Sequence, residues 1–196
     1  MYSIKDNLTQ KYIINKSKFI VELIRIDNDN IVDILNEIKL KYKNADHYCY
    51  AYIFNDFYKI SDDKEPTGTG GIPILKVLQS KKLNHILCVV IRYFGGIKLG
   101  IGGLFRAYQN CVVNTILTAN IKPLMKLYKI EICFSYDKLS NINNLLYKSK
   151  IISKEFKDTI IFKFLCSQNT YNDIKKELFI YSSNTIIIDE FYTLED

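Results

Sequence analysis

The glycines of this chain lie in one stretch, residues 61–106. It begins with Ser61-Asp-Asp-Lys-Glu-Pro-Thr-Gly-Thr-Gly-Gly-Ile-Pro73 and ends with Arg92-Tyr-Phe-Gly-Gly-Ile-Lys-Leu-Gly-Ile-Gly-Gly-Leu-Phe-Arg106. All 8 glycines of the 196-residue chain lie in these two segments. Glycine costs backbone entropy, so it is used where φ is positive or where a ligand or a second backbone comes close. We therefore predict two special loops on one scaffold.

Hydrophobic patterns around the loops alternate between strand and helix. Alternation with β-branched or aromatic residues is typical of strands, and apolar residues at spacings of three and four are typical of helices. The run before the second loop is continuously apolar, as in a strand buried on both faces. The predicted strands are 16–26, 48–54, 55–61 and 85–93, and the predicted helices are 30–42, 73–80 and 104–119.

A change of pattern at residues 119–123 indicates a linker, because Pro123 cannot continue the preceding helix. The elements beyond it follow the order β-α-β-β-α-β of a ferredoxin-like domain. The chain is therefore predicted to have an α+β fold with two domains, residues 1–121 and 124–196. The predicted strands are 125–134, 151–156, 159–166 and 185–192, and the predicted helices are 136–149 and 169–181.

Composition indicates the class of protein. Hydrophobic residues make up 48% of the chain and charged residues 24%, as in a soluble globular protein. No apolar run is long enough to span a membrane, and the polar start lacks a signal-peptide core, so we predict a cytoplasmic protein without membrane contact. The 5 cysteines are scattered without a CxxC pair, which favours reduced core thiols over a metal site or disulfides.

The net charge of +6 belongs mostly to the half that contains the glycines. Residues 1–120 hold 16 Lys+Arg against 11 Asp+Glu, a balance of +5. A basic surface suits a polyanionic partner such as RNA. The alternative is a base-composition effect, since a chain rich in Lys, Ile, Asn and Tyr is also what an AT-rich genome encodes.

The second loop has the features of an anion-binding site. It joins a buried strand to a helix, whose first N–H groups lack internal partners and carry partial positive charge. Glycines let an anion approach these groups. The predicted anion- or RNA-binding residues are Arg92, Gly95, Gly96, Lys98, Gly100, Gly102, Gly103 and Arg106. The loop is not a Walker A motif, and a glycine turn that only permits close packing is the alternative.

The first loop is acidic. Its carboxylates lie beside hydroxyls and glycines, an arrangement that suits Mg²⁺ binding near a phosphate or acid–base chemistry. The same carboxylates are equally suited to pair with Arg92 and Arg106, which locks the two loops together. A third alternative is that Asp63 or Thr69 caps the helix that follows. The candidate residues are Asp62, Asp63, Glu65, Thr67, Thr69 and His47, the histidine lying just before the predicted strand 48–54 and within reach of the loops.

Three long motifs resemble the IMPACT family in its bacterial YigZ-type form. They are residues 46–52 (DHYCYAY), 61–75 and 90–108, and the resemblance is strong over roughly residues 12–120. It implies a first domain similar to domain 2 of ribosomal protein S5 and a second similar to the last domain of elongation factor G. Three positions depart from the usual pattern: Lys64 stands where glycine is common, Ile72 replaces a basic residue and Ile101 replaces a threonine.

The resemblance also suggests a role in translation. Eukaryotic relatives regulate translation by competing for an activator of a stress-sensing kinase, through an additional domain. We therefore predict a translation-associated binding protein that contacts RNA or a ribosome-associated partner, with no bound cofactor and no metal. One alternative is an enzyme acting on a phosphorylated small molecule, with Asp63 or Glu65 as base or Mg²⁺ ligand. Another is a protein–protein interaction module.

Overall fold

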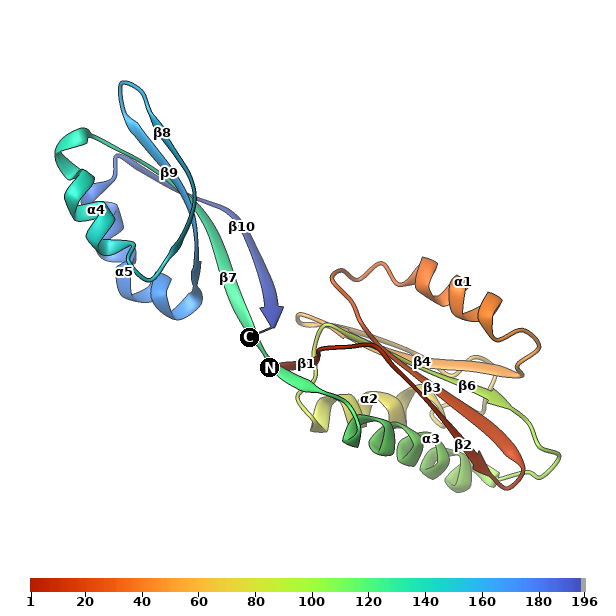
Figure 1. Cartoon of the computed structure of the whole chain (residues 1–196). Helices are drawn as coiled ribbons and strands as arrows, with labels where there is room; N and C mark the ends of the chain where they lie inside the picture. The colour runs from red at the N-terminus through yellow and green to blue at the C-terminus, as the bar shows by residue number, and fades with distance from the viewer. Residues whose placement is uncertain (195–196) are drawn as a thin grey trace. The chain divides into compact units, whose positions relative to one another are not determined.

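The computed structural model describes residues 1–194 and divides the chain into two compact units after Pro123. Each unit has an antiparallel sheet with helices packed on it, so the predicted α+β class is confirmed (Figure 1). The assignment of the units to the S5 domain 2 type and the elongation factor type stays a prediction. Within the described residues, no helix combines the length and the apolar character needed to cross a membrane.

The first unit contains a sheet with the strand order β2-β3-β6-β4-β5, in which every neighbouring pair is antiparallel. A short strand, β1, pairs instead with the start of β7. The strands are β1 (Tyr2–Ile4), β2 (Leu8–Ile14), β3 (Ser17–Arg25), β4 (His47–Phe54), β5 (Phe57–Ser61) and β6 (Ile86–Tyr93), and the helices are α1 (Val32–Lys41), α2 (Gly71–Ser80) and α3 (Gly100–Leu117).

Both faces of this sheet are covered. Helices α2 and α3 pack on one face, where Cys88 and Val90 of β6 point, whereas α1 packs on the other, where Leu87 and Val89 point (Figure 1). This double coverage explains the continuous apolar run of β6. The crossovers β3-α1-β4 and β5-α2-β6 each pass over one strand. The strands that they connect run in opposite directions, the crossovers step sideways in opposite directions, and they lie on opposite faces; these three reversals together give them opposite hands. One of them is therefore left-handed, against the usual rule.

Strand direction brings the two glycine loops together. Strands β5 and β6 are both antiparallel to β4, which lies between them, so β5 and β6 run in the same direction. The loops that follow β5 and β6 consequently leave the sheet at the same end. The first residues of β3 and β4, Ser17 and His47, lie at this end too.

The second unit has two helices on one face of a sheet with the strand order β10-β7-β9-β8. Alternate residues of β7 and β9, among them Ile130, Phe134 and Phe162, form the core with Ile142 and Leu178 of the helices. The elements are β7 (Ile121–Phe134), the 3₁₀ turn η1 (Tyr136–Lys138), α4 (Leu139–Leu145), β8 (Lys150–Phe156), β9 (Ile160–Ser167), α5 (Gln168–Tyr181) and β10 (Asn184–Leu194).

Three details of the sequence-based interpretation are wrong. The expected linker at residues 119–123 contains the start of β7, which pairs with β1 through Ile4↔Ile121. Strands β1 and β2 were not expected at all, because the polar start of the chain obscures them. Helix α3 begins at Gly100 and not after Gly103, so three glycines of the second loop belong to its first turn. The pairing of β1 with β7 joins segments far apart in the sequence, so it leaves no local signal.

Candidate anion-binding site

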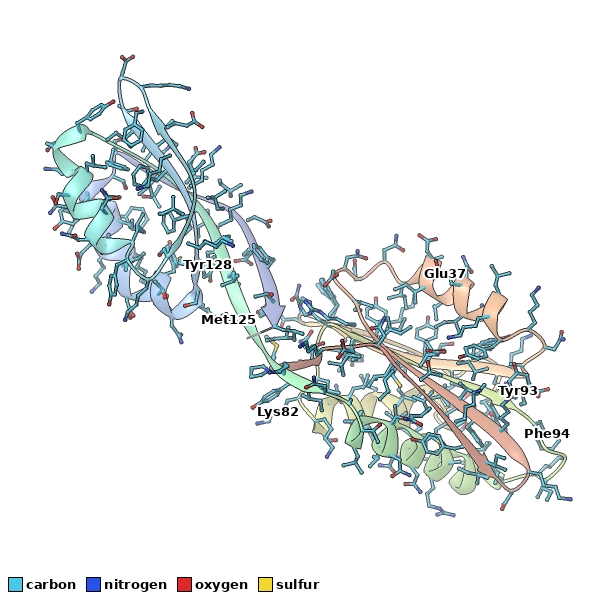
Figure 2. The ribbon with its side chains drawn as sticks, in the orientation of Figure 1. Glu37, Lys82, Tyr93, Phe94, Met125 and Tyr128 are labelled. Carbon is cyan, nitrogen blue, oxygen red and sulfur yellow. The ribbon has the colours of Figure 1, made fainter. Side chains whose placement is uncertain are left out.

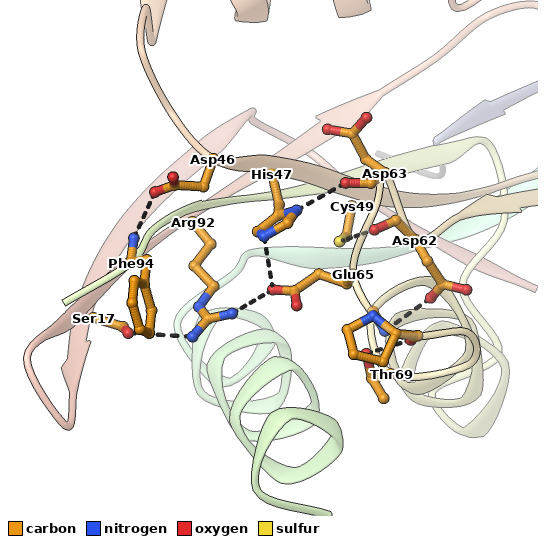
Figure 3. Close-up of polar contacts among 12 residues, drawn as sticks. Ser17, Asp46, His47, Cys49, Asp62, Asp63, Glu65, Thr69, Arg92 and Phe94 are labelled. Carbon is orange, nitrogen blue, oxygen red and sulfur yellow. Dashed lines mark hydrogen bonds and ion pairs between the residues drawn. The ribbon is translucent and has the colours of Figure 1, made fainter. Parts of the chain in front are cut away.

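The two loops are joined by a buried ion pair. Arg92, at the end of β6, donates from Nη1 to Oε1 of Glu65 at 2.6 Å, and the two side chains are 5% and 3% exposed (Figure 3). Tyr108 of α3 donates its hydroxyl to the same carboxylate oxygen at 2.9 Å. Nη2 of Arg92 lies 3.4 Å from the Ser17 hydroxyl. Glu65 therefore links the first loop to β6 and to α3.

His47 supports the same carboxylate from β4. Its Nδ1 lies 2.8 Å from the backbone oxygen of Asp63, and because a carbonyl only accepts, Nδ1 carries a proton. The other ring nitrogen, Nε2, faces Oε1 of Glu65 at 3.8 Å. The carboxylate of Asp63 accepts the backbone N–H of Tyr48 at 2.7 Å. His47 and Asp63 thus fasten the first loop to the start of β4.

The cap of helix α2 comes from Asp62. Its two carboxylate oxygens accept backbone N–H groups from Gly68, Gly70 and Gly71 at 2.8–2.9 Å. Burial by itself raises the pKa of Asp62, but these three donors together hold that pKa below its ordinary value. Asp62, and not Asp63 or Thr69, therefore satisfies the free amides at the start of α2. The Thr69 hydroxyl donates instead to the Pro66 carbonyl, and Thr67 is exposed.

Cys49 lies beneath this loop. Its thiol donates to the backbone oxygen of Asp62 at 3.0 Å and contacts the Tyr108 hydroxyl at 3.3 Å. Burial raises the pKa of the Cys49 thiol far above its ordinary value, and burial likewise raises the pKa of Tyr108. A protonated, enclosed thiol is a packing group. Over residues 1–194, no cluster of three or more His, Cys, Asp or Glu side chains is placed to hold a metal ion.

The first part of the second loop is packed against the β2–β3 hairpin. That hairpin has a two-residue turn, Asn15-Lys16, with φ of 46° and 63°, as a type I′ turn requires. A Cβ on Gly95 would lie 2.0 Å from the carbonyl carbon of Lys16, so only glycine fits there. The N–H of Gly95 donates to Ser17 Oγ, and the N–H of Phe94 donates to Asp46.

The second part of the loop is open. The residue before helix α3 is Leu99, which provides no side-chain cap for its first turn. Gly100 and Gly102 of that turn are exposed. The side chains of Lys98 and Arg106 are also exposed, and Arg106 Nη1 lies 3.7 Å from the position that a Cβ on Gly102 would occupy. Two cations therefore accompany uncapped main-chain amides at the start of α3.

The hairpin adds two further cations beside this loop. Lys16 is in its turn, in backbone contact with Gly95. Lys18 on β3 places its Nζ 5.2 Å from the ring centre of Tyr93, the last residue of β6. Both lysines are exposed. Lys18 shares the α1 face of the sheet with Tyr93, whereas α3 packs on the opposite face. We call the surface formed by Lys16, Lys98, Arg106 and the first turn of α3 the basic surface.

The structure thus separates the residues that the sequence grouped. Arg92 lies in the interior with Glu65, and Gly95 and Gly103 serve packing, since a Cβ on Gly103 would lie 3.2 Å from Leu99 Cβ. Gly96, Lys98, Gly100, Gly102 and Arg106 remain at the surface. Sequence reasoning missed Lys16, Lys18, Ser17 and Tyr108. The two-residue Asn-Lys turn between alternating segments was the available signal for the two lysines.

Residues 15–116, which include both loops and the basic surface, match the Impact N-terminal domain. The chain belongs to the IMPACT family. The predicted resemblance is confirmed. The IMPACT family member YvyE of Bacillus subtilis (strain 168) is 35% identical over 158 residues, 79% of this chain and 73% of that protein. An IMPACT family member of Haemophilus influenzae is 35% identical over 185 residues, 89% of each chain.

A further relative agrees with this membership, and a solved structure extends the comparison to the whole fold. The IMPACT family member YigZ of Escherichia coli (strain K12) is 33% identical over 160 residues, 76% of this chain and 78% of that protein. A crystal structure described as that of a hypothetical protein superposes with a TM-score of 0.66 at 26% identity, covering 96% of this chain and 97% of the other. The fold of both units is therefore shared with a solved structure.

Proposed function

We propose that this IMPACT-family chain is a translation-associated binding protein that contacts RNA through the basic surface. The observation that carries the proposal is the uncapped first turn of α3, with exposed Gly100 and Gly102 beside exposed Lys98 and Arg106. Backbone N–H groups at a helix start and nearby cations are what a phosphate group binds. We also propose that the protein acts in the cytoplasm.

Lys16 of the hairpin favours a polymer with several phosphates over a single small phosphate. Lys16 comes from the turn of the β2–β3 hairpin, whereas Lys98 and Arg106 come from the loop and helix after β6. Cations spread over several elements track a phosphate backbone, and their neutralisation releases counterions. An acidic group also lies beside the loop. It is the carboxylate of Asp46, which is engaged by the Phe94 N–H at 2.7 Å.

The buried polar network prepares this surface for binding. Glu65 with Arg92 and Asp62 with the start of α2 hold both loops without using the side chains of Lys98 or Arg106. A surface that is ordered before binding loses less conformational entropy when the ligand arrives. The buried ion pair therefore holds the two loops in place, and the exposed cations contact the RNA.

The role in translation follows from the family. Eukaryotic members of the IMPACT family, which this chain resembles in its three long motifs, regulate translation. A ribosome-associated protein is the alternative partner in the same setting. RNA is preferred because the surface combines three cations with open main-chain amides, and positive charge of this kind supplies affinity for phosphates and not for a particular protein.

The test measures equilibrium binding of the full chain to a labelled single-stranded RNA by fluorescence anisotropy. We expect affinity to fall steeply between about 50 and 200 mM salt. Lys98→Ala and Arg106→Ala should each weaken binding and reduce the magnitude of the log–log salt slope by about 0.7. Lys59→Ala, at an exposed lysine of β5, is the matched control and should leave binding unchanged. Salt-independent binding, or no effect of either basic-surface variant, would overturn the proposal.

A further inference from the structure

Phe94 is an aromatic side chain held at the edge of the basic surface. It follows β6 directly and is 45% exposed, although a Phe ring is usually buried. Figure 2 shows it beside Tyr93 at the end of the strand. Its backbone is fixed on both sides, because its own N–H donates to Asp46 at 2.7 Å and the next N–H, of Gly95, donates to Ser17 at 3.2 Å.

The ring of Phe94 is supported from the interior by Arg92. The guanidinium carbon of Arg92 lies 5.4 Å from the centre of the Phe94 ring and 5.5 Å from that of the buried Phe19 ring. Both distances are within the range of cation–π attraction. The guanidinium itself is held by Glu65 at 2.6 Å (Figure 3). A half-exposed ring is therefore held in place from behind by a buried and immobile cation.

Tyr93, the neighbouring aromatic residue, is already engaged. Its hydroxyl donates to the backbone oxygen of Lys43 at 3.2 Å, and Lys18 Nζ lies over its ring. Phe94 has no polar atom on its side chain and keeps nearly half of its surface in water. Of these two adjacent rings, Phe94 is therefore the better candidate for contact with a ligand.

We propose that Phe94 stacks on an unpaired nucleobase, so that the RNA bound by the basic surface is single-stranded at that point. This inference rests on the proposed function and names its substrate class. Bases in a duplex have both faces covered by their neighbours, whereas an unpaired base offers a face to an aromatic side chain. Cations that track the backbone together with a ring for a base are the usual elements of single-strand recognition.

The test compares the full chain and its variants on a single-stranded RNA and on a duplex that contains the same sequence. Phe94→Ala should weaken single-strand binding by about 5- to 150-fold, the range for loss of one stacked base. Duplex binding and the salt slope should not change, because no phosphate contact is removed. Phe94→Tyr should bind like the unmodified chain, and Phe94→Leu should resemble Phe94→Ala, since leucine keeps apolar volume without an aromatic face.

Phe57→Ala is the matched control. Phe57 is 71% exposed and lies on β5 at the opposite end of the same sheet, so its removal should leave RNA binding unchanged. Full affinity of Phe94→Leu, or an equal loss on single strand and duplex, would overturn stacking. Salt-dependent RNA binding that Phe94→Ala leaves intact would refute stacking alone and preserve the proposed function. Ribosome binding that survives ribonuclease treatment would assign the surface to a protein partner and overturn both.

Discussion

Arg92 Nη1 and Glu65 Oε1 lie 2.6 Å apart in an ion pair whose two residues are 4% and 7% exposed. The pair joins the two glycine loops, and its two residues are 27 positions apart in the chain. The carboxylate also accepts the hydroxyl of Tyr108, so three elements meet at one oxygen atom. An interior position of this kind makes each partner depend on the other, because either charge left alone would be buried without compensation.

The first prediction concerns this pair. Glu65→Ala should lower the free energy of unfolding by about 3–5 kcal/mol, because it leaves the Arg92 charge buried and unpaired. Arg92→Met should cost a comparable amount for the reciprocal reason. The double variant Glu65→Leu/Arg92→Met should cost much less than the sum of the single changes, since apolar replacement of both partners removes the uncompensated charge. Urea titration measures all three, and additive effects would show that the charges are not coupled.

A second prediction follows from the lowered pKa of Asp62. Asp62→Ala should reduce the free energy of unfolding by about 1–2 kcal/mol at neutral pH, because the start of α2 loses its cap. The folded-state pKa lies below the unfolded one, so the carboxylate stabilises the fold fully above about pH 4, the ordinary Asp pKa. That contribution is lost as pH falls through the lowered pKa.

Urea titrations of the unmodified chain and Asp62→Ala at pH 7 and near pH 3 test the sign of this effect. The difference between the two proteins should shrink at the lower pH. A difference that grows with acidity would mean that the Asp62 pKa is raised in the folded protein. Asp56→Ala, at an exposed aspartate of the β4–β5 turn, is the control.

Backbone conformation at Lys64 gives a third prediction. Asp63 and Lys64 have φ of 37° and 70°, and the N–H of Glu65 closes their turn on the Asp62 carbonyl at 2.9 Å. A side chain in this left-handed region costs roughly 1–2 kcal/mol. Glycine removes that cost, but part of the gain is offset because glycine loses more backbone entropy on folding. Lys64→Gly should therefore raise the free energy of unfolding by roughly 0.5–1 kcal/mol.

Such a gain corresponds to an increase of about 1–4 °C in the melting temperature of a chain of this size. Lys64→Ala separates the backbone effect from the loss of charge, because alanine removes the ammonium group and keeps the Cβ. It should give no comparable gain. Equal stabilisation by glycine and alanine would attribute the effect to charge and not to φ.

The fourth prediction contrasts two glycines of the second loop. Gly95→Ala should destabilise the protein strongly, because its Cβ would meet the backbone of Lys16 at 2.0 Å. Gly102→Ala should instead raise the free energy of unfolding by about 0.5–1 kcal/mol, since its site is helical and open. The same methyl group should weaken RNA binding by covering the first turn of α3. Thermal unfolding and anisotropy distinguish these effects, and a Gly102→Ala variant with full affinity would remove the amides from the proposed contact.

Much of the fold was predictable from local pattern. Six residues of β6, Ile86–Ile91, were recognisable as a doubly covered strand because they are continuously apolar, and both faces are indeed covered by helices. Strand β1 was not predictable, because its three residues are held by a partner about 119 positions away. The start of α3 was placed late, since glycines at positions 100, 102 and 103 weaken the helical pattern although the helix begins at Gly100.

The candidate site was predictable in its residue types and not in their roles. Arg92 and Arg106 flank the same loop and look equivalent in the sequence. Arg92 is on the inward face of β6, in line with Cys88 and Val90, whereas Arg106 is on the solvent side of α3. One alternative was that acidic residues of the first loop pair with Arg92 and Arg106 and lock the two loops together. The structure shows such a pair between Glu65 and Arg92. The cation–π support of Phe94 had no signal in the linear pattern.

Local pattern was enough to assign the α+β class, most of the helices and strands and the position of the flexible backbone. It was enough because periodicity and glycine content depend on neighbouring residues alone. The folded chain decided which charges are buried and which face water. That outcome depends on the parallel course of β5 and β6 and on the helix packed over them, so distant segments determine whether a given arginine meets a carboxylate or remains available to a ligand.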